Sequence, residues 1–249
     1  MANASVLLQK EALRQKLQYF AFKRSGPALG AAISELGEDL YRLQHLAPVP
    51  EGEASPVFID VGASIGIVSV LLCKRWANAR VIALEPAPSN FRYLLWNLRV
   101  NGVTDCVWPL NIAAGGTPLA TKAFFYSPTY PTWTQLAGGD ELTPEDDSWR
   151  GGWPDWQIRF ESETVTLAEV IAAFGLGDIH FLKVDCEGCE WDIFAPHTWA
   201  RLQHRIRNVA TELHSWALPA SAPEGLEEAV RRTVCVHEVT RENTLCSTH

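Results

Sequence analysis

The sequence has 249 residues, which is enough for one large domain with an insertion around a single core. A hydrophobic content of 47% and a charged content of 20% indicate a globular protein and exclude an intrinsically disordered one. The formal net charge of -8 argues against broad nucleic-acid binding, which needs a basic surface. The chain has neither an apolar run near the ~20 residues of a membrane span nor an apolar signal-peptide core, so we expect a cytoplasmic protein.

Residues 1–50 are predicted to form an N-terminal helical cap on a main domain of residues 51–249. Residues 1–26 are basic and carry apolar side chains at helical spacing, which predicts a helix docked on the domain, where it would cover a ligand cleft. A transit peptide or a membrane-surface helix is the alternative. Residues 34–46 show a second helical pattern, and the proline-rich loop after it marks the domain boundary.

Beyond this loop, predicted strands alternate with predicted helices. The strands cover residues 57–62, 80–86, 105–114, 179–188 and 207–216. The helices cover residues 64–76, 89–102, 164–177, 190–194, 197–206 and 226–233. This alternation predicts an α/β fold with a doubly wound, mostly parallel sheet and helices on both faces. Residues 234–248 are expected to add a terminal antiparallel hairpin.

The six cysteines show no disulfide-framework spacing, and a reducing compartment is expected. Cys73 lies in an apolar helical pattern and Cys106 near the start of a strand, so both are expected to be buried small hydrophobic side chains rather than reactive thiols. Cys186 and Cys189 form C-x-x-C, a spacing that can indicate zinc or redox chemistry. No second C-x-x-C accompanies them, and we interpret the spacing as coincidental.

The run DVGASIG at the end of the first predicted strand allows two interpretations. It contains G-x-S-x-G, the nucleophile elbow of serine hydrolases, and also D-x-G-x-x-x-G, a loop that cradles a nucleoside cofactor. An elbow strand usually follows several other strands, whereas this strand is the first. The glycines allow a sharp turn and close helix packing, and the next helix directs free N–H groups at a ligand. The candidate ligand loop consists of Asp60, Gly62, Ala63, Ser64 and Gly66.

Glu85 ends the second predicted strand, 19 residues beyond Gly66. A carboxylate at this position can accept hydrogen bonds from both hydroxyls of a ribose, and a serine elbow has no need of it. Dinucleotide loops have the pattern G-x-G-x-x-G, and Ser64 stands where their second glycine would be. The sequence therefore favours a nucleoside with an amino-acid tail, S-adenosyl-L-methionine, over a dinucleotide or a covalent hydrolase intermediate.

Several motifs occur in the order seen in FkbM-family methyltransferases, and the chain resembles that family over roughly residues 57–216. They are FIDVGASIGIVSVLL, VIALEPAPSNFRYLLWNLRVNG, NIAAGG, TLAEVI, FLKVDCEGCEWDIF and ATELHSW. The resemblance implies a class I methyltransferase with a Rossmann-like fold and S-adenosyl-L-methionine as donor. It also implies a hydroxyl acceptor as the commonest case, often on a sugar or natural product. Within these motifs, Pro86, Asn111 and Ala113 are further candidates for cofactor contact.

Acidic residues and a histidine follow the predicted strands 179–188 and 207–216. Period-2 alternation puts Lys183 and Asp185 on one face, and a lysine in so apolar a strand is expected to pair with that carboxylate. Parallel sheets bind ligands at the carboxyl ends of their strands. The residues expected to meet in one crevice are Asp185, Glu187, Glu212 and His214. The alternative is an internal ion pair that only fixes the strand end.

A hydroxyl acceptor needs a base as it attacks the donor methyl group. His214 is the first candidate because its unperturbed pKa lies near neutrality, and Glu187 is the second if burial raises its pKa. Asp185 could instead contact the methionine part of the donor. These side chains, with Glu190, could also bind a divalent metal, but their spacing is not metal-specific, so a metal-free site is favoured.

The stretch 117–165 is too long for an ordinary connection and contains four tryptophans. It predicts either an extra hairpin on the sheet edge or a lid whose aromatic faces hold a sugar, a flat ring or an alkylated amine. We therefore expect an O-methyltransferase acting on a small molecule. The alternatives are N-methylation of an amine or peptide and a non-catalytic, protein-binding relative of the fold. The sequence does not predict the oligomeric state.

Overall fold

The computed structural model describes most of the main domain and four residues before it. The described residues are 41, 43, 46, 49, 55–76, 78–127, 130–136, 158–219, 222–233, 236–237 and 246–247. The helices predicted in residues 1–26 and 34–46 lie outside the described residues, apart from three positions of the second pattern. No helix in the described part of the chain combines the length and the apolar character that crossing a membrane requires.

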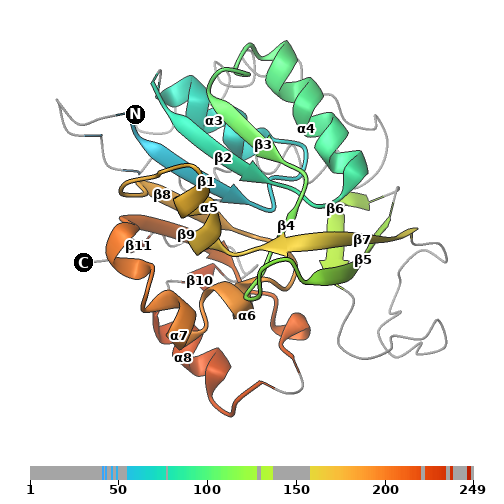
Figure 1. The fold of residues 1–249 in the computed structure, drawn as a ribbon, viewed down its shortest axis with the longest axis vertical. Helices are drawn as coiled ribbons and strands as arrows, with labels where there is room; N and C mark the ends of the chain where they lie inside the picture. Colours follow the sequence, from blue (N-terminus) through green and yellow to red (C-terminus); the bar gives the residue numbers. More distant parts are fainter. Residues whose placement is uncertain are drawn as a thin grey trace, which may run out of the picture.

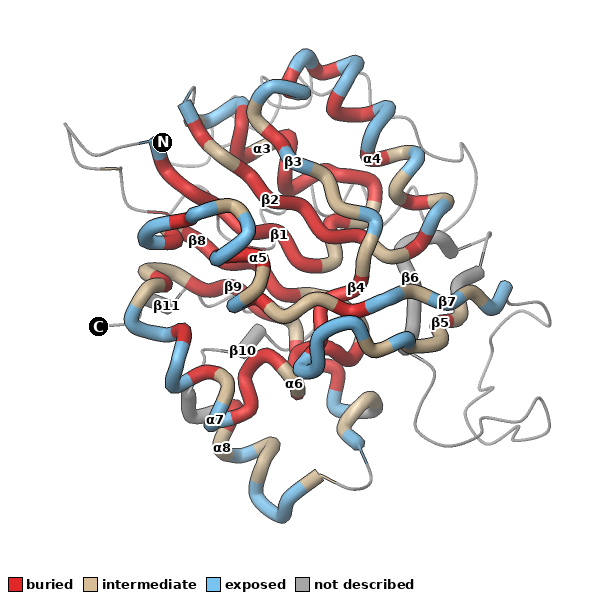
Figure 2. Tube along the Cα trace, viewed as in Figure 1, coloured by how far each residue is buried: buried red, intermediate tan, exposed pale blue. Residues whose placement is uncertain are grey.

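A parallel sheet forms the centre of the molecule (Figure 1). Its order is β10-β9-β8-β1-β2-β3, and each neighbouring pair in this order is parallel. The bounds are β1 Val57–Val61, β2 Arg80–Leu84, β3 Val107–Leu110, β8 Phe181–Val184, β9 Asn208–Glu212 and β10 Val236–His237. Every residue of the central strands β1 and β8 is buried, as expected of a parallel sheet with helices on both faces (Figure 2).

Helices cover both faces of this sheet, so the doubly wound α/β class predicted from the sequence is confirmed. The α-helices are α3 Ile67–Arg75, α4 Pro88–Val100, α5 Leu167–Ala173, α6 Glu190–Ile193, α7 Pro196–Trp199 and α8 Leu226–Thr233. Short 3-10 turns occupy Gln203–Arg205 and Ser215–Ala217. Helix α5 begins with a capping box, in which Thr166 and Glu169 bind each other's backbone N–H groups.

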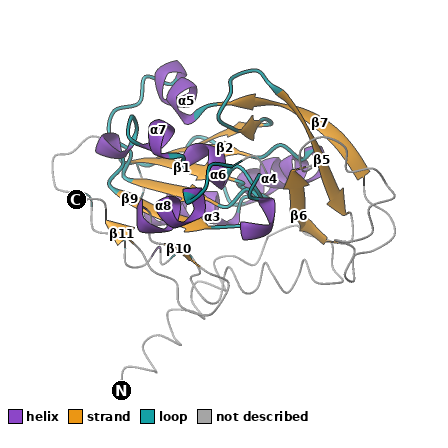
Figure 3. Ribbon diagram, turned by 90° about the horizontal axis from the view of Figure 1, so that it is seen from below, coloured by secondary structure: helices purple, strands orange, loops and turns teal. Residues whose placement is uncertain are grey.

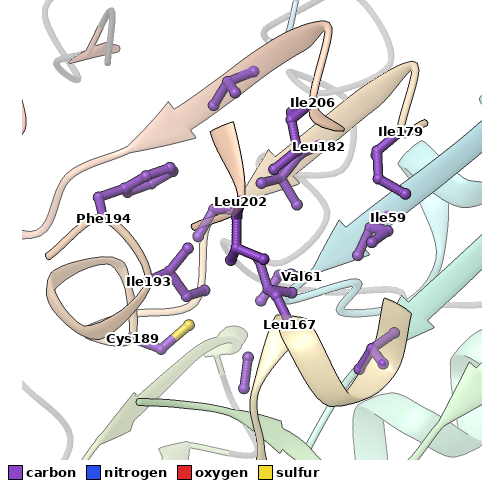
Figure 4. Close-up of a cluster of buried hydrophobic side chains, with 14 of the residues drawn as sticks. Ile59, Val61, Leu167, Ile179, Leu182, Cys189, Ile193, Phe194, Leu202 and Ile206 are labelled. Atoms are coloured by element: carbon purple, nitrogen blue, oxygen red, sulfur yellow. The ribbon is translucent and has the colours of Figure 1, made fainter. Parts of the chain in front are cut away.

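Two apolar clusters lie on opposite faces of β1, because alternate side chains of a strand point in opposite directions. Ile59 and Val61 pack with α5, α6 and α7, as Figure 4 shows for the larger cluster. Phe58 packs on the other face with α3 and α4. Tyr41, Leu43 and Leu46 belong to this second cluster, so the short described part of the N-terminal region is anchored beside α3 and α4.

Within the predicted insertion 117–165, three strands make a smaller sheet beside the main one (Figure 3). They are β5 Thr121–Ser127, β6 Tyr130–Leu136 and β7 Ile158–Val165, and the two-residue β4, Ala113–Ala114, pairs with β7. β5 is antiparallel to both β6 and β7. The predicted strand 105–114 is therefore divided, since its last two residues join the smaller sheet.

The terminal hairpin expected at residues 234–248 was wrong in its pairing. β10 pairs with β9 in parallel, and β11, Cys246–Ser247, pairs with β9 in the antiparallel direction. Both short strands therefore add to the open edge of β9, whose backbone N–H and C=O groups need partners. The predicted antiparallel edge is present, but its partner is β9.

The expectation that the cysteines are unpaired was also wrong for four of them. Cys73 on α3 is joined to Cys106, just before β3, and their Cα atoms lie 6.0 Å apart. Cys186 and Cys189 are joined across the turn after β8. The first pair escaped sequence analysis because 33 residues separate its members, and only the two crossovers beside β2 bring them together.

Candidate active site

The turn after β1 is clamped between the ends of two neighbouring strands. Gly62 has a positive φ, and its N–H, like that of Ala63, donates to the carbonyl of Leu84 at the end of β2. A Cβ on Gly62 would overlap the backbone carbonyl of Asp185, at the end of β8. Only glycine combines this conformation with so close an approach.

Gly66 performs the second role predicted for the loop. It also has a positive φ, and a Cβ there would collide with the side chain of Leu94 on α4. The side-chain amide of Asn97, also on α4, donates to the carbonyl of Ile65 at 2.7 Å. Helix α4 therefore packs directly on the loop.

Glu85 is almost fully buried beneath the loop, and backbone donors already bind its carboxylate. One oxygen accepts from the N–H of Ser64 and the other from the N–H of Ala87, each at 2.8 Å. Burial raises the pKa of Glu85 to about 7, although these two hydrogen bonds and the charge of Lys183 oppose the shift. The carboxylate joins the loop to the end of β2, and contact with a ribose would have to use its remaining lone pairs.

A narrow crevice opens where β1, β2 and β8 end. Its enclosed volume is only about 10 Å³. It is lined by Val61, Gly62, Leu84, Pro86, Ala113, Ala114, Lys122, Phe124, Cys186 and Cys189. Three predicted cofactor residues, Gly62, Pro86 and Ala113, therefore come together here. Sequence analysis missed Lys122 and Phe124, which β5 supplies, since nothing in a strand's sequence states what it will face.

The other predicted cofactor residues lie beside or beneath this crevice. Asn111 donates to the carbonyls of Glu85 and Pro86, at 2.8 and 3.0 Å, and so holds the turn after β2. Ala63 is buried in the apolar cluster under α3. The Ser64 hydroxyl is buried without a hydrogen-bond partner among the described residues, which is an observation that fits a polar ligand at the loop.

Lys183 connects the loop to the acidic residues after β8. Its ammonium donates to the Gly62 carbonyl at 2.6 Å and lies 3.5 Å from Asp60 and 3.7 Å from Asp185. The predicted pairing with Asp185 is thus accompanied by two further partners. Asp60 itself is fully buried and accepts a hydrogen bond from Ser69 at 2.6 Å, so it supports the loop from below.

The four residues predicted to share a crevice do meet, around the imidazole of His214. Its Nε2 lies 3.2 Å from Glu187, 3.8 Å from Glu212 and 3.9 Å from Asp185. Glu187 adopts a positive φ, which costs an ordinary L-residue about 1–2 kcal/mol. This backbone conformation brings its carboxylate to the imidazole, and such outliers concentrate at functional sites.

Glu190 orients the imidazole from its other side. One oxygen of its fully buried carboxylate lies 3.0 Å from Nδ1 of His214. The N–H groups of Cys186 and Gly188 each donate to the same carboxylate at 2.8 Å. The firmly held Glu190 carboxylate keeps a hydrogen on Nδ1 of His214. The Nε2 atom of the same ring then points toward the other three carboxylates.

Burial and mutual charge shift the pKa values in this cluster strongly. Although burial opposes it, the surrounding carboxylates, with Glu190 first, raise the pKa of His214 to about 10. Burial, with the neighbouring acids, raises the pKa of Glu187 to about 8 and that of Glu212 to about 7. Burial would also raise the pKa of Asp185, but Lys183 and His214 bring it below its ordinary value. The neutral pKa that favoured His214 as a base is therefore not its pKa in this site.

The sequence model of the FkbM methyltransferase domain matches residues 60–232, which include the loop, the crevice and the whole acidic cluster. The chain belongs to the FkbM methyltransferase family. The FkbM assignment agrees with the parallel sheet and with glycine at the turn after β1, and it makes this chain a methyltransferase.

Curated proteins of similar sequence match about 70% of the chain. Methyltransferase sdnD of Sordaria araneosa is 27% identical over 200 residues, which cover 68% of this chain and 70% of that protein. The 31-O-demethyl-FK506 methyltransferase FkbM of Streptomyces tacrolimicus is 30% identical over 198 residues and covers 72% of both chains. The AMB antimetabolite synthetase AmbE of Pseudomonas aeruginosa is 28% identical, but the match spans only 9% of its length.

Among solved structures, the methyltransferase FkbM from Methylobacillus flagellatus covers 84% of this chain and 49% of its own. Its sequence identity is 17% and its TM-score 0.40. This chain therefore spans about half the length of that protein. The assignment to the FkbM family rests on the family match and on the curated relatives.

The acidic cluster around His214 also offers donor atoms of the kind that divalent metals bind. One ligand atom each of Asp185, Glu212 and His214 lies within 4.8 Å of the others. Two oxygens and one imidazole nitrogen suit several divalent cations. The same Nε2 cannot ligate a metal and accept a proton at once, so the two roles of His214 exclude each other.

Proposed function

We propose that this FkbM domain transfers a methyl group from S-adenosyl-L-methionine to a hydroxyl group of a small natural product or sugar. One observation carries the proposal: the turn after β8 contributes both to the lining of the crevice at the glycine turn and to the carboxylate–imidazole cluster. Gly62 lines the crevice and packs on the backbone of Asp185, and the disulfide-linked Cys186 and Cys189 line it from the same turn that holds Glu187. A methyl donor in the crevice would therefore lie near the carboxylates and the imidazole of this cluster.

The residues of the loop fit this donor. Gly62 lets the turn lie against the backbone of Asp185, and the buried Ser64 hydroxyl lacks, among the described residues, a partner that a polar ligand would provide. When bound, S-adenosyl-L-methionine supplies an electrophilic methyl group on a sulfonium, which is a good leaving group. Glu85 would hold the ribose hydroxyls, and Pro86 with Ala113 would flank the adenine ring. The protein's own task is then mainly alignment.

His214 and its carboxylates supply the proton acceptor in this proposal. Glu190 orients Nδ1, so Nε2 faces the space that the acceptor hydroxyl would enter. With a pKa of about 10 the imidazole is protonated at neutral pH. A positive charge beside it lowers its proton affinity, and the sulfonium is such a charge. Glu187, 3.2 Å from Nε2, has the lower pKa of the two, about 8, so in its ionised form it can take the proton from Nε2 and leave the imidazole free to accept the proton of the hydroxyl.

The relatives support the oxygen acceptor. The Streptomyces tacrolimicus protein is called a 31-O-demethyl-FK506 methyltransferase, which describes methylation of an oxygen, and it is 30% identical to this chain. Nitrogen acceptors are the competing hypothesis, because hydroxyl and amine acceptors can both be served by an oriented base.

Two measurements on the full chain test the proposal. Calorimetry should show stoichiometric uptake of S-adenosyl-L-methionine, and incubation with labelled donor and a metabolite extract should give a product methylated on oxygen by mass spectrometry. His214→Ala should lower turnover much more than donor affinity, while Gly102→Ala, at a turn away from the crevice, should leave both unchanged. No donor uptake would refute the proposed function, and a product methylated on nitrogen would replace the acceptor class. Loss of activity on chelation, restored by a divalent cation, would make His214 a metal ligand.

A further inference from the structure

Tyr41 lies outside the FkbM match, which begins at residue 60, yet its side chain reaches the candidate active site. Its hydroxyl donates to Oδ2 of Asp185 at 2.6 Å, across 144 residues of sequence. Its ring lies over the ammonium of Lys183, 5.3 Å from Nζ to the ring centroid. The residue is only 5% exposed. A buried contact of this kind needs a backbone that is held in place.

Two contacts hold the backbone beside Tyr41. The carbonyl of Leu43 accepts a hydrogen bond from the guanidinium of Arg75, at the end of α3, at 2.5 Å. The side chains of Leu43 and Leu46 are buried in the apolar cluster under α3 and α4. The segment is therefore attached to the same helix that follows the glycine turn.

The hydrogen bond from Tyr41 decides how Asp185 presents its two oxygens. Oδ2 is taken by the phenol and lies 3.7 Å from Lys183. Oδ1 is the oxygen that faces Nε2 of His214, at 3.9 Å. A carboxylate held at one oxygen cannot turn its other oxygen away from the imidazole without losing that bond.

We propose that Tyr41 is a positioning residue of the methyltransferase site, which fixes the carboxylate of Asp185 so that its free oxygen faces the imidazole and the incoming acceptor. The proposal rests on the proposed function, because it assigns a role to Asp185 in that reaction. It also makes Tyr41, which precedes the matched family domain, a part of the active site. A purely structural role for Tyr41 would need only its ring, which phenylalanine supplies equally well.

Tyr41→Phe separates these two roles, since it removes the hydroxyl and keeps the ring over Lys183. The matched control is Tyr93→Phe on α4, which removes a phenol that lines a different pocket, together with Ser89, Arg92 and Trp96. We expect both variants to keep the thermal midpoint of the wild type. Only Tyr41→Phe should lower kcat, by about 10-fold, the effect of one hydrogen bond to a charged group. It should also move the acid limb of the pH–kcat profile to higher pH, because a carboxylate that loses a donor is protonated more readily.

A second measurement does not depend on turnover. ¹³C NMR titration of labelled aspartate carboxyls, with Asp185→Asn to assign the resonance, should show a higher pKa for Asp185 in Tyr41→Phe than in the wild type. An unchanged titration, or a changed titration with unchanged kcat and pH profile, would overturn the positioning role. Wild-type protein that takes up no donor would refute the proposed function instead, and the titration would still show whether Tyr41 controls the carboxylate.

Discussion

Replacing Gly62 with alanine tests whether the turn after β1 must lie against the backbone of Asp185. Gly62 has a φ of +74°, and a Cβ there would overlap the Asp185 carbonyl oxygen and lie 2.8 Å from the carbonyl carbon. The left-handed conformation costs an L-residue about 1–2 kcal/mol. Overpacking against backbone, which cannot rotate away as a side chain can, costs about 1–3 kcal/mol more. We therefore expect Gly62→Ala to lower the free energy of unfolding by about 2–5 kcal/mol.

Gly102→Ala is the matched control for the conformational part of this cost. Gly102 has a φ of +63°, and nothing lies within 4 Å of the position its Cβ would take. Urea unfolding followed by tryptophan fluorescence gives both free energies, and calorimetric titration gives the affinity for the methyl donor. The Gly62 variant should lose more stability than the control and bind the donor at least about 10-fold more weakly, which is about 1.4 kcal/mol. Equal destabilisation with unchanged donor affinity would refute the close approach of turn and strand end.

Three further predictions concern the buried acids. Glu85→Gln offers one acceptor oxygen where two backbone N–H groups need one each, so donor affinity should fall by about 10-fold in calorimetry; an unchanged affinity would contradict the role of this carboxylate. Glu190→Gln removes the charge nearest Nδ1, so the pKa of His214 should fall below about 10 in an NMR titration of the ring, and a constant pKa would show that Glu190 is not its main cause. Because Glu85, Glu187 and Glu212 have pKa values raised from 4.5 to between about 7 and 8, and His214 from 6.5 to about 10, the folded protein retains protons that the unfolded chain releases. The contribution of these groups to stability should therefore be greatest below about pH 4.5 and fall as pH rises toward 10; urea midpoints, measured without donor, that rise from pH 6 to pH 9 would contradict this.

The elements that the sequence predicted well have strong local signals. The run DVGASIG predicted a strand, a turn and a helix because its two glycines interrupt an apolar run. In the structure both glycines have a positive φ and the roles expected of them. The capping box of Thr166 and Glu169 is likewise a local signal, because the two residues stand three positions apart at the start of α5. The meeting of Asp185 with His214 could be predicted because adjacent parallel strands end at the same edge of the sheet.

The features that sequence analysis missed depend on contacts between distant segments. The phenol of Tyr41 reaches Asp185 across 144 residues, and no local pattern singles it out from other aromatic residues. The link between Cys73 and Cys106 needs the spacing of two crossovers. The high pKa of His214 depends on Glu190 at the start of α6. Nothing in the neighbouring sequence indicates that this carboxylate points back at the imidazole. Type and order of elements were local properties, whereas the electrostatics of the site were not.

Lys183 explains why the donor loop and the acidic cluster behave as one unit. Its side chain is only 2% exposed, and a buried positive charge needs negatively charged or polar partners. Both the loop and the acidic cluster provide such partners. It donates to the Gly62 carbonyl of the loop, and it lies 3.5 Å from Asp60 beneath the loop and 3.7 Å from Asp185 in the cluster. Any displacement of the loop would therefore leave a buried ammonium short of a partner and would alter the field at Asp185. Lys183 thus holds the glycine turn in place and also lowers the pKa of Asp185, the proposed catalytic carboxylate.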